Sequence, residues 1–369
     1  MTAQQHETVV IGGGQAGLAT AYYLAKLGQS FVVLDAGQRV GDVWRNRWDS
    51  LTLFTPARYS SLPGLPFPAE PGYFPTRLEM AEYLESYAGS FALPVQLGIK
   101  ATRLSPRADG FELDTTEGVI HANQVVIATG AFPTPRVPPA ATQLDPAIHQ
   151  VHSSAYHNPD QLPPGDVLVA GAASSGTQIA LDLAANRRVW LAGKSSPFVP
   201  NRILGFSLFG LLTRTVFRVP VTTTPGQRIA ERLVSKGYPV VGYAPSVVEE
   251  AGILRVPRVV GQQGGWPELA DGQVLKPAVT VWATGFRYDY NWIDLRVFGE
   301  DGKPRQRRGV VDKAPGLYFI GLPFMYSGLS AIITGVGADA AHIARHIGER
   351  AAASEQTDRA ASRLPQPAS

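Results

Sequence analysis

The chain has 369 residues, of which 44% are hydrophobic and 17% are charged, which suits two globular domains and excludes a disordered protein. The formal net charge is only +3, and no basic run is interleaved with aromatic residues, so nucleic acid is a poor candidate partner. The chain has no cysteine, which excludes disulfides, Cys-ligated metal centres and thiol-based redox relays within it.

Nothing in the sequence indicates a membrane or a metal. The N-terminus lacks a signal-peptide pattern, and the longest apolar run, residues 203–212, is too short to span a bilayer. His342 and His346 lie four residues apart on an expected helix, but without the glutamate of a zinc-protease helix we interpret them as helix-surface residues. We therefore expect a cytoplasmic protein with no metal site; a homodimer is compatible with the composition.

A glycine-rich turn follows the first expected strand. Residues 8–11 form a short β-branched run, typical of a buried parallel strand. Gly12, Gly14 and Gly17 then match Gly-x-Gly-x-x-Gly. In this pattern the first glycine permits the tight turn, the second lets the backbone approach a pyrophosphate, and the third lets the next helix pack closely on the strand. The N-terminus of that helix, expected over residues 18–27, offers free N–H groups to phosphate.

An acid follows this turn at the expected distance. A second strand, residues 30–35, ends at Asp35, about twenty residues past the turn, where a carboxylate accepts hydrogen bonds from a ribose. Asp35 could instead be an ordinary loop or helix-capping acid, but the complete order of strand, turn, helix, strand and acid favours the ribose. The next stretch, residues 40–68, has too many prolines for regular structure.

Residues 167–184 repeat the strand, turn and helix. Gly171 and Gly176 stand at the first and third glycine positions, but Ala173 replaces the middle glycine. An alanine methyl is small, so we expect a pyrophosphate to bind slightly farther away or less tightly.

The strand after this second turn ends without an acid. Lys194 and Ser195 follow it, and a cation with hydroxyls suits a ribose 2′-phosphate, whereas an acid suits a free 2′-hydroxyl. Lys194 could also be a plain solvated loop lysine. The pattern favours a 2′-phosphorylated dinucleotide over its unphosphorylated form.

Two strands that end in Ala-Thr-Gly flank the second turn, at residues 128–130 and 283–285. A strand followed by a glycine turn is a place where the chain can pass to another domain, so we expect one domain inserted into another. The predicted fold is α/β, with two Rossmann-like dinucleotide-binding domains. The predicted boundaries are residues 1–160 and 286–350 for the outer domain, 161–285 for the inner domain, and 351–369 for a disordered tail.

With both turns and both Ala-Thr-Gly segments, the sequence resembles the flavin-containing monooxygenases. It is most similar to the short bacterial members, relatives of Baeyer–Villiger and plant indole-pyruvate monooxygenases. GDVW, residues 41–44, matches the family's Gly-Gly-x-Trp, with Asp42 in place of the second glycine. Residues 47–56, 75–84 and 316–344 carry further similarity. The family's linker signature Phe-x-Gly-x-x-x-His keeps His152 but has Pro146 and Ile148 at its first two defined positions.

The resemblance implies FAD in the first turn and NADPH in the second, with NADH as the alternative cofactor. NADPH would reduce FAD, O₂ would add to form a C4a-hydroperoxide, and one oxygen atom would pass to a small lipophilic substrate by S- or N-oxidation or a Baeyer–Villiger reaction. No catalytic side chain is identified, and His152 is either near the domain interface or a structural linker residue. The expected cofactor-binding residues are Gly12, Gly14, Gln15, Ala16, Gly17, Asp35, Gly41, Trp44, Arg45, Ala128, Thr129, Gly130, Gly171, Ser174, Ser175, Gly176, Lys194, Ser195, Ala283, Thr284 and Gly285.

Two other functions share these features. One is an NAD(P)H-dependent flavin reductase or diaphorase that transfers electrons without oxygenation. The other is a non-enzymatic sensor of nucleotides. Residues 202–243 have no place in the two-turn scheme, and either cover a substrate route or pack as a lid without selectivity.

Overall fold

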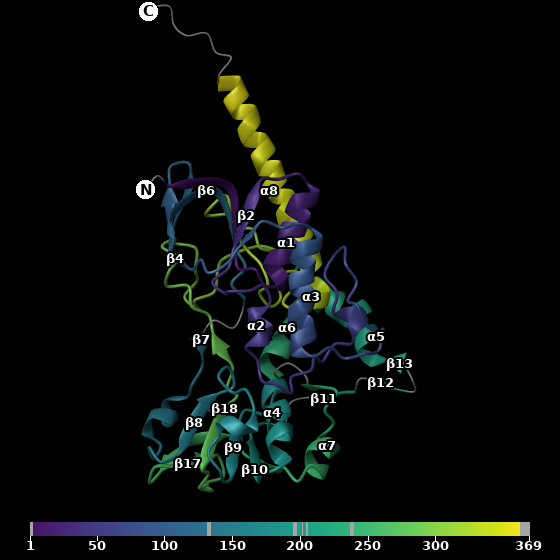
Figure 1. The fold of residues 1–369 in the computed structure, drawn as a ribbon, viewed down its shortest axis with the longest axis vertical. Helices are drawn as coiled ribbons and strands as arrows, with labels where there is room; N and C mark the ends of the chain where they lie inside the picture. The colour runs from purple at the N-terminus through teal and green to yellow at the C-terminus, as the bar shows by residue number, and fades with distance from the viewer. Residues whose placement is uncertain are drawn as a thin grey trace, which may run out of the picture.

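The structure is a computed structural model that describes residues 3–130, 134–194, 198–200, 202–203, 206–236 and 240–361. Two sheets lie one above the other in Figure 1, each with its own helices, and a long C-terminal helix crosses the upper unit. The chain builds the upper sheet first, passes to the lower sheet, and returns. This arrangement is the predicted one, a domain inserted within another.

The upper sheet has seven strands. Its parallel part runs in the order β3 (Val95–Gln96), β2 (Phe31–Leu34), β1 (Gln4–Ile11), β6 (Gly118–Ile127) and β20 (Leu317–Phe319). β4 (Ala101–Arg107) and β5 (Gly110–Thr115) form an antiparallel hairpin along the first half of β6. Since β20 pairs with the second half of β6, the C-terminal part of the chain completes a sheet begun by the N-terminal part.

Three helices belong to this upper unit: α1 (Gln15–Lys26), α3 (Arg77–Ser90) and α8 (Ile333–Ala361). α8 packs against α1 and then continues beyond the body of the protein (Figure 1). Residues 351–361 are therefore helical, which corrects this part of the predicted disordered tail, because the alanines of this segment favour continuation of the helix; residues 362–369 lie outside the described residues. His346 is also not a plain surface residue, since its Nδ1 lies 3.1 Å from the hydroxyl of Tyr318.

The lower sheet is entirely parallel. Its order is β15 (Leu254–Val256), β10 (Val189–Ala192), β9 (Val167–Ala170), β18 (Val279–Trp282) and β8 (His149–His152). Every residue of β9, β10 and β18 is buried, as expected of parallel strands covered on both faces. β8 precedes residue 161, so the predicted start of the inner domain is too late; the short strand lacks the glycine-rich turn that marks the others.

Both sheets follow one plan. In each, the chain moves outward through three strands and returns to the other side of the first one, which leaves a switch point between β1 and β6 and another between β9 and β18. Each also carries an antiparallel hairpin before the returning strand; in the lower unit it is β16 (Val259–Gln263) with β17 (Trp266–Leu269). Ligands of open parallel sheets bind at such switch points, at the carboxyl ends of the strands.

The two units are joined by two adjacent crossings. β7 (Thr134–Pro135) leads into the lower unit and β19 (Phe286–Arg287) leads out of it, and the two pair antiparallel. The N–H of Arg136 donates to the carbonyl of Gly285 at 2.9 Å beside this pair. The crossings therefore hold each other in place.

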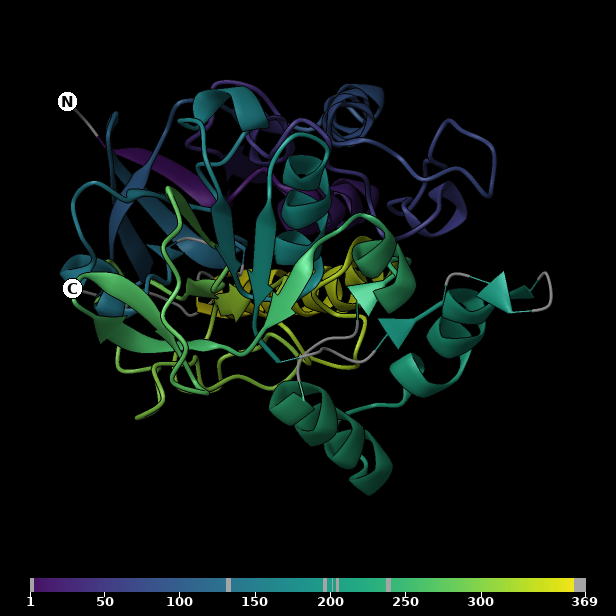
Figure 2. The same ribbon diagram turned by 90° about the horizontal axis from the view of Figure 1, so that it is seen from below.

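A smaller subdomain leaves the lower unit between β10 and β15. Its stem is the parallel pair β11 (Phe198–Val199) and β14 (Val240–Val241), and it contains the short pair β12 (Arg202–Ile203) and β13 (Phe206–Ser207). Its helical elements are α5 (Leu208–Arg214), η4 (Val216–Arg218) and α6 (Thr224–Lys236), and α7 (Pro245–Glu250) follows the stem. Figure 2 shows α5 and α6 standing away from the lower sheet.

The remaining described segments are short turns. Residues 40–68 hold only α2 (Asp42–Arg45) and η1 (Ala57–Tyr59), while η2 (Pro139–Gln143) and η3 (Pro159–Gln161) lie on either side of β8. Of the helices that the structure describes, none is both long and apolar enough to cross a membrane.

Candidate dinucleotide-binding sites

The first glycine turn lies at the switch point of the upper sheet. Gly12 has φ +112°, and a Cβ added to it would lie 2.5 Å from the carbonyl oxygen of Ala128. A Cβ on Gly17 would lie 1.8 Å from the carbonyl oxygen of Gly12. No side chain fits either position, so both glycines are required for the helix to start this close to the sheet. We call this turn, residues 12–17, the first cradle.

The second turn, residues 171–176, reproduces this geometry, and we call it the second cradle. Gly171 has φ +120° and a Cβ there would lie 2.2 Å from the carbonyl oxygen of Ala283. A Cβ on Gly176 would lie 1.7 Å from the carbonyl oxygen of Gly171. The two cradles are equivalent in backbone and in packing, as the sequence predicted.

The middle positions of the two cradles differ in side chain only. Gly14 has φ −79° and ψ −173°, and Ala173 has φ −85° and ψ −175°, so both are extended and an alanine is unstrained. A Cβ on Gly14 would meet nothing within 4 Å, and Ala173 is exposed. The methyl of Ala173 therefore affects no part of the fold, and a ligand approaching the helix is the group it would meet.

The helices that follow the cradles have open N-termini. α1 begins with Gln15 and Ala16, and α4 (Ser174–Ala184) begins with Ser174 and Ser175; neither has a side-chain cap or an acid in its first turn. By contrast, α3 is closed by a capping box between Thr76 and Glu79. Uncapped first-turn N–H groups at the positive end of a helix dipole suit an anion. Both cradles thus fit the pyrophosphate of a dinucleotide.

Each Ala-Thr-Gly segment forms the wall of one cradle and then turns the chain away. Ala128 and Ala283 supply the carbonyls that the first glycines touch. Gly130 and Gly285 adopt positive φ values of +78° and +82°. Thr129 is exposed, and the hydroxyl of Thr284 donates to the carbonyl of Arg136 in the neighbouring crossing. These segments therefore join each cradle to the crossings between the units.

Asp35 is bonded directly to the first cradle. Its Oδ2 accepts the N–H of Gly13 at 2.5 Å and its Oδ1 accepts the N–H of Gly37 at 2.7 Å. The carboxylate thus fixes the cradle to the loop after β2. Each carboxylate oxygen can accept more than one hydrogen bond, so a ribose can still be bound here.

The strand register shows that Lys194 does not stand at the position equivalent to Asp35. The N–H of Gly12 donates to Leu34 and the N–H of Gly171 donates to Ala192, so Gly193 occupies the place of Asp35. Lys194 lies one position further and is exposed; Ser195 lies outside the described residues. The shift arises because α4 has 11 residues where α1 has 12.

The residue next to this position explains why the second cradle has no acid at Gly193. A Cβ on Gly13 would lie 3.0 Å from Oδ2 of Asp35, so the first cradle needs a glycine there. The second cradle has Ala172 at that position, and a Cβ on Gly193 would lie 3.2 Å from the Cβ of Ala172. The methyl of Ala172 thus takes the space that a carboxylate would need.

The residues after β2 have structural partners. A Cβ on Gly41, which has φ +90°, would lie 2.6 Å from the carbonyl oxygen of Ala81 on α3. The guanidinium of Arg45 donates to the carbonyl of Val40 at 2.5 Å and to Glu85 at 2.6 Å. Trp44 is partly buried against the core of the upper unit. Gly41 and Arg45 therefore hold the loop on α3, and their contact with a cofactor stays a prediction.

Asp42 explains the departure from Gly-Gly-x-Trp. Its Oδ2 accepts the N–H groups of Gln38 and Arg39 at 3.0 and 2.9 Å. The carboxylate of Asp42 thus closes the turn between β2 and α2. A glycine at this position would have no side chain to accept these hydrogen bonds.

His152 is a structural linker residue. Its Nδ1 accepts the N–H of Ser154 at 3.1 Å, so its Nε2 carries the proton and donates to the carbonyl of Gly285 at 3.0 Å. Burial lowers the pKa of this imidazole, although the bond to Gly285 opposes that effect. The histidine therefore joins the end of β8 to the second Ala-Thr-Gly segment in its neutral form.

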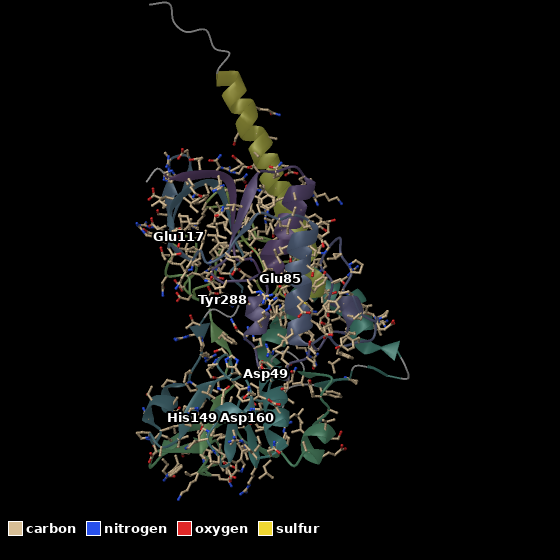
Figure 3. The ribbon with its side chains drawn as sticks, viewed as in Figure 1. Asp49, Glu85, Glu117, His149, Asp160 and Tyr288 are labelled. Carbon is tan, nitrogen blue, oxygen red and sulfur yellow. The ribbon has the colours of Figure 1, made fainter. Side chains whose placement is uncertain are left out.

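Asp49 connects the loop after α2 with the lower unit (Figure 3). Its N–H donates to the carbonyl of His157 at 2.7 Å, and its carboxylate accepts from Asn158 at 2.8 Å and pairs with Arg77. The hydrogen bond from Asn158, with the charge of Arg77, holds the pKa of Asp49 below its usual value. Asp49 is thus ionised and links the upper unit to the lower unit through hydrogen bonds.

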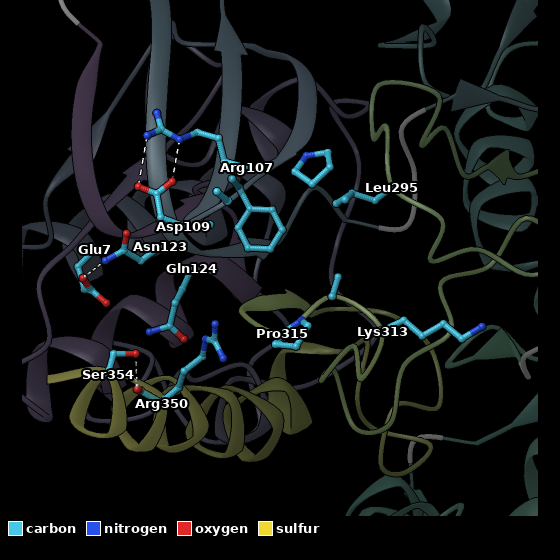
Figure 4. A pocket seen from close by; sticks show the side chains of 15 residues that line it. Glu7, Arg107, Asp109, Asn123, Gln124, Leu295, Lys313, Pro315, Arg350 and Ser354 are labelled. Carbon is cyan, nitrogen blue, oxygen red and sulfur yellow. Dashed lines mark hydrogen bonds and ion pairs between the residues drawn. The ribbon is translucent and has the colours of Figure 1, made fainter. Parts of the chain in front are cut away.

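A cavity of about 540 Å³ opens elsewhere, beside the β4–β5 hairpin and α8 (Figure 4). None of its lining residues belongs to either cradle. Its polar groups are largely paired with one another: Arg107 with Asp109 at 2.8 Å, and Asn123 with Glu7 at 2.5 Å. The cradles, and not this cavity, are the candidate sites.

Comparison with known proteins agrees with this geometry. The model of a family described as pyridine nucleotide-disulphide oxidoreductase matches residues 9–201, more than half of the chain. The chain belongs to the pyridine nucleotide-disulphide oxidoreductase family. It is accordingly an oxidoreductase with two Rossmann-type domains, which confirms the predicted fold class.

Several known proteins are similar to this chain over most of their length. An uncharacterized oxidoreductase, CzcO-like, of Geobacillus kaustophilus is 41% identical over 345 residues, 92% of this chain and 98% of the relative. The indole-3-pyruvate monooxygenase YUCCA4 of Oryza sativa subsp. japonica is 29% identical, over 93% of this chain and 87% of the relative. A flavin-containing monooxygenase from Stenotrophomonas maltophilia has a TM-score of 0.79 with 26% identity, covering 94% of this chain and 99% of that one. The resemblance seen in the sequence is confirmed.

Glycine-to-alanine substitutions in the first cradle should separate fold from ligand binding. Gly17→Ala forces a methyl into the carbonyl of Gly12, so we expect a stability loss of about 1–3 kcal/mol and loss of flavin. Gly14→Ala should leave the thermal midpoint of the apoprotein unchanged and weaken flavin binding only. Ala173→Gly should tighten binding at the second cradle. Equal thermal midpoints for the Gly14→Ala and Gly17→Ala variants would contradict this account.

Asp35→Ala should weaken flavin retention more than Asp42→Ala. Both substitutions remove a carboxylate that accepts two backbone N–H groups, but only Asp35 bonds to the cradle. A charge-assisted hydrogen bond contributes about 1.5–3 kcal/mol, so we expect the Kd of the flavin to rise roughly tenfold to a hundredfold in Asp35→Ala. Titration of the apoprotein with FAD measures it, and equal Kd values for the two variants would remove the special role of Asp35.

Proposed function

We propose that the protein is an NADPH-dependent flavin monooxygenase that transfers one atom of O₂ to a small lipophilic substrate in the cytoplasm. The observation that carries the proposal is the pair of equivalent cradles in one chain that has no cysteine. Two dinucleotides can be bound at once, which hydride transfer between nicotinamide and flavin requires. The similarity to flavin monooxygenases supports the oxygen-transfer step.

The lack of cysteine separates this protein from the disulphide-reducing chemistry in the family's name. Disulphide exchange needs a thiolate that attacks a disulphide sulfur. No residue of this chain can supply one. A dithiol relay within the chain is therefore excluded, and electrons must leave the flavin towards O₂ or another acceptor.

We assign FAD to the first cradle because it holds its ligand more firmly. Gly14 allows the closest approach of backbone to pyrophosphate, and Asp35 is available for the ribose. We assign NADPH to the second cradle, where Ala173 keeps the pyrophosphate farther off and Gly193 stands in the place of Asp35. A cofactor that leaves after each turnover suits the weaker cradle.

FAD, when bound, supplies the redox chemistry and the activation of oxygen. The residues of the chain bind and orient. Backbone N–H groups at the starts of α1 and α4 neutralise the pyrophosphates, and Lys194 lies one residue past the place of the ribose acid, where it can pair with a 2′-phosphate. Asp49 links the two units, and His152 holds the second Ala-Thr-Gly segment at the crossing between them, so both help to fix how the two cofactors face each other. None of these side chains needs to act as an acid or a base.

The cofactor preference should depend on Lys194. Flavin reduction should be faster with NADPH than with NADH, because the second cradle has no acid to repel a 2′-phosphate. Lys194→Ala removes a charge-assisted contact, so we expect the NADPH-to-NADH ratio of kcat/KM to fall about tenfold, the equivalent of roughly 1.4 kcal/mol. Lys276→Ala, at another lysine of the inner unit, is the control. An unchanged ratio in Lys194→Ala would place the phosphate elsewhere.

Oxygen transfer is tested with labelled dioxygen. Incubation with NADPH, ¹⁸O₂ and a panel of sulfides, amines and ketones should give a product that carries one ¹⁸O atom, with NADPH consumption matching product. A flavin reductase would instead convert the labelled dioxygen to hydrogen peroxide, with no label in any product across the panel. A protein that only senses nucleotides would not oxidise NADPH at all.

A further inference from the structure

A short segment of the subdomain between β11 and β14 packs on the upper unit. The N–H of Val221 donates to the carbonyl of Tyr326 at 2.8 Å. Phe217 lies against Gly328, since a Cβ added to that glycine would be 3.3 Å from Cδ1 of Phe217. Residues 217–221 belong to the inner unit in sequence, yet they pack on a loop that belongs to the outer one.

That loop, residues 321–331, is attached to the first cradle at both ends. At its start, a Cβ on Gly321 would lie 3.0 Å from the Cβ of Ala16. At its end, the side chain of Gln15 donates to the carbonyl of Ala331 at 3.2 Å. Gln15 and Ala16 are the first two residues of α1, so the loop follows the cradle where the FAD is proposed to bind.

The middle of the loop is braced from behind. The N–H groups of Tyr326 and Ser327 donate to the hydroxyl oxygen of Ser330 at 3.0 and 3.1 Å. The guanidinium of Arg308 lies 4.0 Å from the centroid of the Tyr326 ring. Asp339 on α8, only 1% exposed, is 3.8 Å from Nε of Arg308. Phe217 thus meets a firmly held surface beside the first cradle.

A second contact joins the other end of the subdomain to the upper unit. The hydroxyl of Tyr243 lies 3.3 Å from that of Thr52, whose carbonyl also accepts from Gln178 on α4 at 3.4 Å. The upper unit is therefore contacted both before α6, at residues 217–221, and after it, at Tyr243. The subdomain is positioned by the upper unit as well as by its stem.

We propose that Phe217, on the segment 217–221, contacts the substrate and sets the largest size that reaches the flavin. The inference rests on the monooxygenase function proposed above. Phe217 presents an aromatic side chain next to the loop that follows the first cradle, from a subdomain that contributes no residue to either cradle. An aromatic wall selects for apolar molecules by size, since each methylene group that fits or fails to fit changes specificity by about 1–3 kcal/mol.

The test compares Phe217→Ala with Val216→Ala, a neighbouring control at a residue that is 39% exposed. Two measurements are made on the FAD-loaded proteins. The first is quenching of the flavin fluorescence by acrylamide, which reports access to the flavin without turnover. The second is the ratio of kcat/KM for dibenzyl sulfide over methyl phenyl sulfide, with NADPH and O₂.

We expect Phe217→Ala to raise the quenching constant and to raise the sulfide ratio roughly tenfold or more in favour of the larger substrate, with Val216→Ala unchanged in both. Gly328→Ala should also change the ratio, because its new methyl would lie 3.3 Å from Cδ1 of Phe217 and displace the ring.

The outcomes are distinguishable. An unchanged quenching constant in Phe217→Ala overturns the inference, whether or not sulfides are oxygenated. A raised quenching constant with an unchanged ratio also overturns it, because the ring then covers the flavin without meeting substrates. A raised quenching constant without oxygenation by any variant refutes the monooxygenase function and supports Phe217 as the residue that limits access to the flavin.

Discussion

The structure depends on one close approach made twice: the third glycine of each cradle meets the carbonyl oxygen of the first, with no room for a single carbon atom. This approach brings the N-terminus of a helix directly over the end of a strand, so unpaired N–H groups and the positive helix end meet at one point. The first glycine in turn rests on the alanine of an Ala-Thr-Gly segment. The segment that forms this wall is therefore also the segment that leads into the crossing between units.

The two cradles share this backbone geometry and differ in a few side chains. Gly13 with Asp35 in one half corresponds to Ala172 with Gly193 in the other, so a carboxylate has been exchanged for a methyl in the same space. Gly14 corresponds to Ala173 without any change in backbone. The first cradle has the carboxylate of Asp35 and a glycine at its middle position. The second cradle has neither, and Lys194 lies one residue past the place of the acid. Three positions thus distinguish the two cradles, and they are the basis of the proposal that one cofactor stays bound while the other is exchanged.

The sequence predicted what local patterns encode. Glycine spacing identified both cradles, and β-branched strands before Ala-Thr-Gly predicted the insertion. It failed where tertiary contacts decide. β8 has four residues and no signal of its own, and only pairing with β18 assigns it to the lower sheet. The residue of the second cradle that corresponds to Asp35 is Gly193 and not Lys194, because α4 is one residue shorter than α1. The structural roles of Arg45 and Asp42 could not be seen, because Glu85 and the turn at residues 38–39 approach them only after folding.

The pairing of β7 with β19 has a consequence for whether the inner unit can be removed from the chain. Because the inner unit enters and leaves through neighbouring strands, its two ends lie side by side, and β20 can still find β6 after more than 180 intervening residues. An insertion with adjacent ends adds little constraint to its host. A short link between residues 135 and 286 would therefore replace the inner unit and leave the upper unit, with the first cradle, as a protein in its own right.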